Sequence, residues 1–112
     1  MKKIEAVIRH EKFEEVKKAL SEIGIRGITV IDVKGAGRQG GFTETYRGHK
    51  VTINLRPKLK IEIISKEAYV KEIAEVIRDK AKTGEIGDGK IFISSVDNAI
   101  AIRSGEEGPS AL

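Results

Sequence analysis

The chain switches repeatedly between two hydrophobic periods, one typical of strands and one typical of helices. Residues 2–9 alternate, with Ile4, Ala6 and Ile8 on one face, and this pattern predicts a strand. From residue 13 to residue 23 the apolar positions recur at helical spacing, and Gly24 is well suited to end a helix. The chain therefore begins with a predicted strand followed by a predicted helix.

The same order of elements returns further along the chain. Runs rich in β-branched side chains predict three more strands, at residues 25–33, 59–65 and 91–96. Val70, Ile73 and Ile77 recur at helical spacing and predict a second helix, which stops by Gly84. A shift of 57 positions, from Ile4 to Ile61, lays the third strand and the second helix over the first pair.

Two copies of a βαβ unit predict an α+β fold, the ferredoxin-like double βαβ sandwich, with a four-stranded antiparallel sheet and two helices on one face. The length suits a single domain over residues 1–112. Ile, Val and Ala lie on both sides of the predicted strands, so the face without helices is expected to be covered by self-association.

Residues 35–58 form a polar, glycine-rich stretch between two apolar segments, and Pro57 closes it. Such a long loop is usually functional, and we interpret it as a mobile effector loop that binds an anion. The composition of the loop supports this interpretation, because its five glycines allow the backbone to approach a ligand closely and its five basic residues outnumber the single acid, Glu44. The glycines are Gly35, Gly37, Gly40, Gly41 and Gly48, and the basic residues are Arg38, Arg47, Lys50, Arg56 and Lys58.

A second glycine-rich loop, TGEIGDGK at residues 83–90, resembles a phosphate cradle, because backbone N–H groups in such a turn can converge on an anion and Lys90 adds a charge. It lacks the Ser or Thr of a P-loop and precedes a strand, so an ordinary turn remains the alternative. Arg38, Lys58, Lys90 and Arg103 can face one anion only if both loops and the end of the last strand meet.

Composition excludes several other classes. The net charge of +4 comes from mixed charges, which argues only weakly for nucleic acid. The chain has no cysteine, no apolar run long enough for a bilayer and no signal-like N-terminus, which favours a soluble cytoplasmic protein. Its few aromatic residues and many Lys and Glu residues resemble the composition of a thermophile's protein. His10 and His49 have no third ligand at metal spacing, and no nucleophile has a paired base, so catalysis is not expected.

Two rival classes fit less well. An acylphosphatase-like hydrolase has its glycine-rich loop between the first strand and the first helix, where this chain has none. An RNA-recognition sheet needs exposed aromatic residues on its central strands, and we interpret Phe92, the candidate on a strand, as a core residue.

Three segments, GAGRQGGFTETYRG, TGEIGDGKIFIS and IRSGEEG, closely resemble the PII nitrogen-regulatory signal proteins, in the same order and spacing over essentially the whole chain. The resemblance implies a trimer with a T-loop at residues 37–55, a B-loop at residues 83–90 and a C-terminal loop after Arg103. It also implies a nucleotide between neighbouring subunits and 2-oxoglutarate beside MgATP at the base of the T-loop.

Residue by residue, the resemblance implies a set of ligand contacts. ATP or ADP would be bound by Thr29, Gly35, Gly37, Arg38, Glu62, Ile64, Gly87, Asp88, Gly89, Lys90 and, from the adjacent subunit, Arg103. The 2-oxoglutarate site would comprise Gln39, Gly41 and Lys58, with Gln39 also a ligand of Mg²⁺. Tyr46 and Arg47 would contact a partner, which the family offers as an ammonium transporter, glutamine synthetase or another nitrogen enzyme.

The chain departs from the family pattern at three positions. Val51 replaces the tyrosine that many bacterial members modify with a nucleotide, so that modification is excluded here, and His49 replaces a serine phosphorylated in another branch. Ala101 replaces one of two arginines near the last strand, a loss of ~1.5 to 3 kcal/mol of phosphate contact if nothing compensates. The alternative is therefore a PII-like relative that senses nucleotide or another small ligand without a 2-oxoglutarate response.

Overall fold

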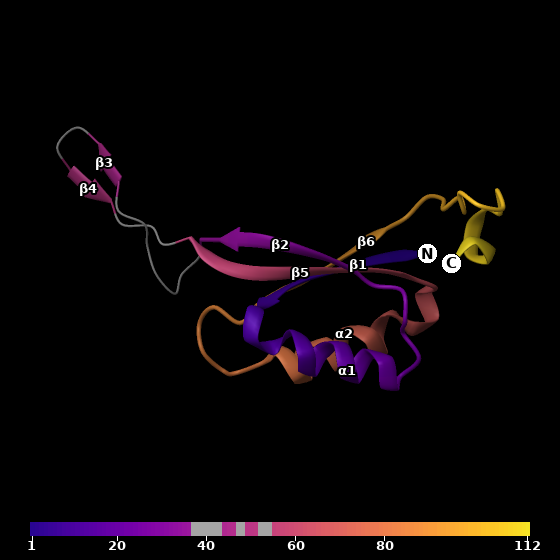
Figure 1. Cartoon of the computed structure of the whole chain (residues 1–112), viewed down its shortest axis with the longest axis horizontal. Coiled ribbons are helices and arrows are strands. Elements are labelled where there is room, and N and C mark those ends of the chain that lie inside the picture. Colours follow the sequence, from indigo (N-terminus) through magenta and orange to yellow (C-terminus); the bar gives the residue numbers. More distant parts are fainter. Residues whose placement is uncertain (37–43, 47–48, 52–54) are drawn as a thin grey trace.

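The computed structural model describes residues 1–36, 44–46, 49–51 and 55–112. Its main sheet has four antiparallel strands in the order β2-β5-β1-β6, which are β2 (Thr29–Gly35), β5 (Arg56–Ser65), β1 (Lys2–Arg9) and β6 (Gly89–Ser95). Helices α1 (Phe13–Glu22) and α2 (Val70–Ala81) lie side by side on one face of this sheet (Figure 1). The predicted ferredoxin-like fold is confirmed.

The two halves of the chain correspond closely. Short 3-10 turns, η1 (His10–Lys12) and η2 (Glu67–Tyr69), lead into α1 and α2 at equivalent places in the 57-residue repeat. The repeated core positions are buried in both halves, as Ile4 and Ile61 from the strands and Leu20 and Ile77 from the helices illustrate. Apolar area between sheet and helices therefore stabilises the fold through one shared core.

The first helix ends as its sequence predicts. Gly24 has φ +88°, and its N–H donates to the Ser21 carbonyl at 3.0 Å while the Ile25 N–H donates to the Leu20 carbonyl at 2.9 Å. This pair of hydrogen bonds is a Schellman motif, and glycine suits its left-handed position because it has no Cβ.

Three strand boundaries differ from the prediction. Strand β2 begins at Thr29, since the apolar Ile25 and Ile28 pack beside the core without pairing in the sheet. Strand β5 already begins at Arg56 and contains Pro57, which pairs with Lys34 beyond the end of β1, where the missing proline N–H needs no partner. Strand β6 begins at Gly89, inside the predicted second loop.

The long loop predicted at residues 35–58 contains secondary structure. Besides the first residues of β5, it holds the short strands β3 (Glu44–Tyr46) and β4 (His49–Val51), which pair with each other antiparallel as a separate sheet. The sequence shows no clear alternation there, so these strands were not predictable from hydrophobic period.

The sheet face opposite the helices, which we call the open face, is more polar at its centre than predicted. Four charged residues meet there, the charge tetrad Lys3, Glu5, Lys60 and Glu62, with nitrogen–oxygen distances of 2.9 to 3.9 Å. Apolar residues flank the tetrad, among them Ile31, Ile64 and Phe92. The interpretation of Phe92 as core is wrong, because its side chain is 55% exposed on this face.

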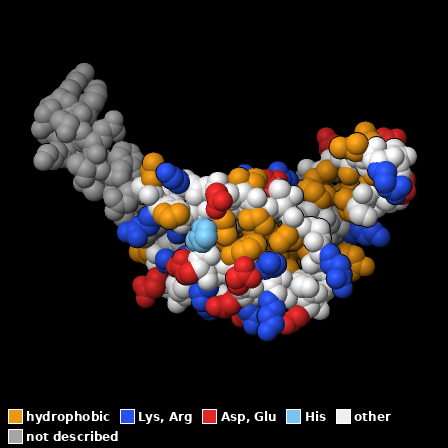
Figure 2. Space-filling view, viewed as in Figure 1, with side chains coloured by type: hydrophobic (Ala, Val, Ile, Leu, Met, Phe, Trp, Pro, Cys, Tyr) orange, Lys and Arg blue, Asp and Glu red, His pale blue; other side chains and the backbone are white. Residues whose placement is uncertain are grey.

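Charged side chains of both signs line the outer, lower side of the helix layer, and hydrophobic side chains are visible between them and the sheet (Figure 2). Among the described residues, no helix is long and apolar enough to cross a membrane.

Candidate ligand site at the 83–89 loop

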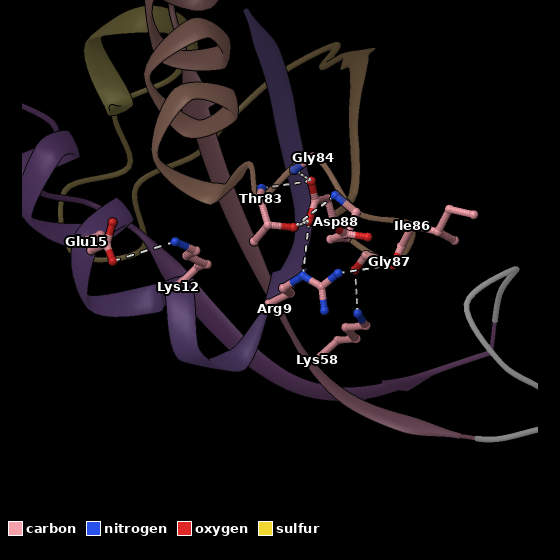
Figure 3. Close-up of polar contacts among 10 residues, drawn as sticks. Arg9, Lys12, Glu15, Lys58, Thr83, Gly84, Ile86, Gly87 and Asp88 are labelled. Carbon is pink, nitrogen blue, oxygen red and sulfur yellow. Dashed lines mark hydrogen bonds and ion pairs between the residues drawn. The ribbon is translucent and has the colours of Figure 1, made fainter.

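Asp88 organises the loop that connects α2 to β6. Its Oδ2 atom accepts hydrogen bonds from the backbone N–H groups of Thr83 and Gly84, both at 2.9 Å, and its Oδ1 atom accepts from the Thr83 hydroxyl and from Arg9 Nε (Figure 3). Donors that favour the carboxylate form, first of all the Thr83 hydroxyl, hold the pKa of Asp88 well below its usual range. The loop is thus closed around one partly exposed carboxylate, that of Asp88, which stays ionised.

Two cations from neighbouring strands hold the outer part of the loop. Arg9, the last residue of β1, lies directly opposite Lys58, the third residue of β5. Arg9 Nη2 donates to the Ile86 carbonyl at 3.0 Å, and Lys58 Nζ donates to the Gly87 carbonyl at 2.6 Å (Figure 3). These contacts tie the loop to the end of the sheet at two consecutive carbonyls.

Burial lowers the pKa of Lys58, and the nearby Arg9 and Arg56 charges lower it further, while Glu11 and Asp88 act in the opposite direction. The residue is only 7% exposed. A buried ammonium beside two guanidinium groups favours an anion, because an added negative charge would offset their mutual repulsion.

Gly89 allows the loop to join the sheet. Its φ is +101°, and a Cβ built on it would lie 1.7 Å from the Val7 carbonyl oxygen. Only glycine combines this conformation with so close an approach to β1, which explains why the motif needs a glycine before Lys90.

A cavity of about 590 Å³ opens beside the loop. Of the residues predicted to bind ligand, it brings together Gly35, Lys58, Gly87, Asp88, Gly89 and Lys90. Val7 and Phe92 add apolar wall. A site with two lysines, glycine backbone and an apolar wall suits a ligand that is anionic at one end and flat and apolar at the other.

Four further predicted nucleotide residues that the structure describes, Thr29, Glu62, Ile64 and Arg103, do not line this cavity. Thr29 lies opposite Glu62 in the register of β2 and β5, and Ile64 follows two positions later. From Lys58 to Glu62 the strand advances about 13 Å, at roughly 3.3 Å per residue. The residues on β2 and β5 are therefore separate from the candidate nucleotide residues at the cavity.

Arg103 belongs to a third region, the C-terminal segment after β6. Ile100 and Glu107 form an isolated bridge there, and the Ala101 N–H donates to the Glu106 carbonyl at 2.8 Å. The segment lies at the opposite end of the sheet from the 83–89 loop (Figure 1). Apolar side chains gather over it (Figure 2), and Ile102 is fully exposed.

Several predicted residues cannot be placed. Gly37, Arg38, Gln39, Gly41 and Arg47 lie outside the described residues, and Tyr46 is described only as part of the β3 backbone. Among the described residues, no cluster of three or more His, Cys, Asp or Glu side chains is placed to hold a metal ion.

Arg9 and Thr83 are site residues that sequence reasoning missed. Arg9 ends an alternating strand, where a lysine or arginine is ordinarily solvated, and its contact with Asp88 spans 79 residues. The Thr-Gly pair five residues before Asp88 was a usable signal, since a carboxylate commonly accepts from backbone N–H groups nearby in a turn.

Comparison with known proteins agrees with this architecture. The family model described as nitrogen regulatory protein P-II matches residues 1–106. Similar curated proteins include the P-II protein of Rhodospirillum rubrum, 52% identical over 112 residues and 100% of both chains, and P-II 2 of Methanothermobacter thermautotrophicus, 54% identical over 100% of this chain and 97% of that relative. A crystal structure of Arabidopsis thaliana PII bound to citrate has a TM-score of 0.81 at 39% identity and covers 99% of this chain and 91% of that one.

The chain therefore belongs to the nitrogen regulatory protein P-II family. Proteins of this family are regulatory signalling proteins of nitrogen metabolism and not enzymes, so no residue here is assigned a catalytic role. The predicted membership is confirmed.

Proposed function

We propose that this protein is a cytoplasmic, homotrimeric sensor that binds ATP or ADP with Mg²⁺, together with 2-oxoglutarate, and regulates a nitrogen-metabolism target through its T-loop. The observation that carries the proposal is the cavity in which Gly35, Lys58 and the loop residues Gly87 to Lys90 meet. Lys90 and the glycine backbone suit phosphates, and Val7 with Phe92 suits a nucleobase or ribose face.

The separation of the candidate residues supports a site shared between copies. Thr29, Glu62 and Ile64 lie along β2 and β5 away from the cavity, and Arg103 lies at the far end of the sheet. In the proposed trimer, a neighbouring copy would supply the β2–β5 residues and Arg103 to the cavity of the first. The exposed Ile100, Ile102 and Leu112 of the C-terminal segment are suited to be covered by such a neighbour.

Lys58 would couple the binding of the nucleotide to the binding of 2-oxoglutarate. Its ammonium donates to the Gly87 carbonyl, and a carboxylate of 2-oxoglutarate would compete for the same protons. A ligand that prefers one arrangement of Lys58 and the loop shifts the population toward it, by no more than its differential affinity. The Arabidopsis relative bound to citrate supports a carboxylate ligand in this family. Gln39 would hold Mg²⁺, which would supply positive charge to the anionic ligands.

The target would be an ammonium transporter, glutamine synthetase or another nitrogen enzyme, contacted through Tyr46 and Arg47. A second candidate function is a relative that reports nucleotide, or another small ligand, without a 2-oxoglutarate response. Two observations favour it: Lys58 is already hydrogen-bonded to Gly87, and Ala101 offers no charge to the phosphates.

Calorimetric titration of the purified protein with ATP and with ADP, each with and without Mg²⁺, tests the proposal. We expect micromolar binding that Lys90→Gln weakens and that Lys34→Gln, an exposed lysine on β2, leaves unchanged. Absence of binding by either nucleotide at millimolar concentration would overturn the proposal.

A further inference from the structure

A second cavity, of about 450 Å³, lies on the helix side of the 83–89 loop. The C-terminal end of α2, strand β1, the start of β6 and the loop itself enclose it, and we call it the helix-side cavity. Its volume is within the range of small-molecule sites, about 300 to 1,000 Å³. Asp88, Gly89 and Lys90 line both this cavity and the one described above, so the loop forms a wall between the two.

The floor of the helix-side cavity is aliphatic. Ile8, Ile77 and Ala81 line it and are each at most 5% exposed, and Ile91 packs partly buried against the same core. Ile93, two positions further along the same face of β6, is 50% exposed, so α2 leaves part of this edge strand uncovered. No lining residue is aromatic. Such a surface suits a hydrocarbon chain, which would gain by leaving water.

Three cations surround this aliphatic floor. Arg78 and Lys82, at the end of α2, and Lys90, at the start of β6, all line the cavity. Among the residues that the structure describes, none of the three forms an ion pair. Of the two acids that line it, Asp88 is already paired within the fold, which leaves Glu85 against three positive charges. An excess of one charge around a partly enclosed apolar cavity attracts a ligand of the opposite charge.

We propose that the helix-side cavity binds a small aliphatic monocarboxylate, with the hydrocarbon chain on the apolar floor and the carboxylate paired with Arg78 and Lys82. A guanidinium group matches a carboxylate with two parallel hydrogen bonds, which gives Arg78 the larger part. A dicarboxylate such as 2-oxoglutarate suits this cavity poorly, because it has a charge at both ends and no apolar end. The inference goes beyond the proposed function and does not depend on nucleotide binding.

The test is a titration of the full-length protein followed through its methyl resonances by nuclear magnetic resonance. Octanoate is the probe, octanamide has the same chain without the charge, and octylammonium carries the opposite charge. We expect octanoate to bind with a dissociation constant of about 0.1 to 1 mM and to shift the methyl groups of Ile8, Ile77, Ala81 and Ile91. Octanamide should bind at least about fivefold more weakly, and octylammonium more weakly still.

Two variants of the same helix separate the proposed contact from a general effect of charge. Arg78→Gln alters an exposed residue that lines the cavity, and it should weaken octanoate binding at least about fivefold while leaving octanamide binding unchanged. Lys80→Gln is the matched control, since Lys80 is exposed, lies 3.8 Å from Asp79 and does not line the cavity. It should leave both affinities unchanged.

Several results would overturn the inference. The four methyl groups would fail to respond if a neighbouring copy of the chain covers the cavity. Equal affinity for octanoate and octanamide, or equal effects of Arg78→Gln and Lys80→Gln, would exclude the carboxylate contact. Shifts that spread to the exposed Ile100 and Ile102 without saturating would show detergent-like adsorption in place of a site. Nucleotide titrations are made without octanoate, so this inference and the proposed function fail independently.

Discussion

Arg9 Nε donates to Asp88 Oδ1 at 3.0 Å, which joins the last residue of β1 to the loop before β6. The same guanidinium reaches the Ile86 carbonyl, so one side chain holds the loop at two points. The loop between α2 and β6 is therefore held in a defined conformation by contacts with the sheet.

Replacement of Asp88 tests this role of the loop. Asp88→Asn removes the charge that accepts from Thr83, Gly84 and Arg9, and we expect the free energy of unfolding to fall by about 1 to 3 kcal/mol. Urea denaturation measures the change. Asp79→Asn, at an exposed aspartate of α2, is the control and should cost less than about 0.5 kcal/mol. Equal effects of the two substitutions would contradict the role assigned to Asp88.

The depressed pKa of Asp88 predicts a dependence of stability on pH. Because the folded state binds this proton less readily than the unfolded state, the contribution of Asp88 is fully present above the ordinary aspartate pKa of about 3.9 and is lost as the pH falls toward the folded value. The difference in unfolding free energy between the unaltered protein and Asp88→Asn should shrink as the pH is lowered from about 5 toward 2. A difference that stays constant over this range would show that ionisation of Asp88 is not involved.

Substitution of Gly84 and of Gly89 distinguishes the cost of a positive φ from the cost of a steric clash with backbone. Gly84 and Gly89 have similar positive φ values of +92° and +101°, but only Gly89 lies against backbone, at the Val7 carbonyl. Gly84→Ala should cost about 1 kcal/mol of stability, and Gly89→Ala about 3 kcal/mol or more together with loss of nucleotide binding. Thermal denaturation and nucleotide titration of both variants measure this. Similar losses in both would indicate that φ alone matters.

Replacement of Lys58 tests the proposed coupling of ligands. Lys58→Met removes the ammonium that holds Gly87 and that a carboxylate would compete for, so 2-oxoglutarate binding should weaken at least about tenfold. Lys34→Met, an exposed lysine of similar size on β2, should leave it unchanged. The measurement is a calorimetric titration with 2-oxoglutarate in the presence of MgATP, and unaltered affinity in Lys58→Met would exclude this role.

Much of the fold followed from the sequence because the same βαβ pattern occurs twice. Ile4 and Ile61, or Leu20 and Ile77, occupy equivalent core positions, so each half supported the interpretation of the other. The boundaries of β2 and β5 were less predictable. Ile25 and Ile28 are apolar because they pack on the core, and Pro57 is tolerated in a strand because β1 has already ended.

The candidate site was only partly predictable. The glycine-rich motif at residues 83–90 indicated Gly87, Gly89 and Lys90 as site residues, because their spacing is visible within one short segment. The contribution of Arg9 depends on a contact between residues far apart in sequence, and the polar centre of the open face depends on the register of β1 and β5, which places Glu5 opposite Glu62. Neither property is visible in a local pattern.

The measurement that tests the central claim most directly is a calorimetric titration of 2-oxoglutarate into the unaltered protein, with and without MgATP. The account predicts binding in the presence of MgATP and much weaker binding in its absence, since in the proposed function the two ligands would bind side by side around Lys58 and the 83–89 loop. Equal affinity under both conditions, or no binding in the presence of MgATP, would contradict a sensor that couples adenine nucleotide to 2-oxoglutarate.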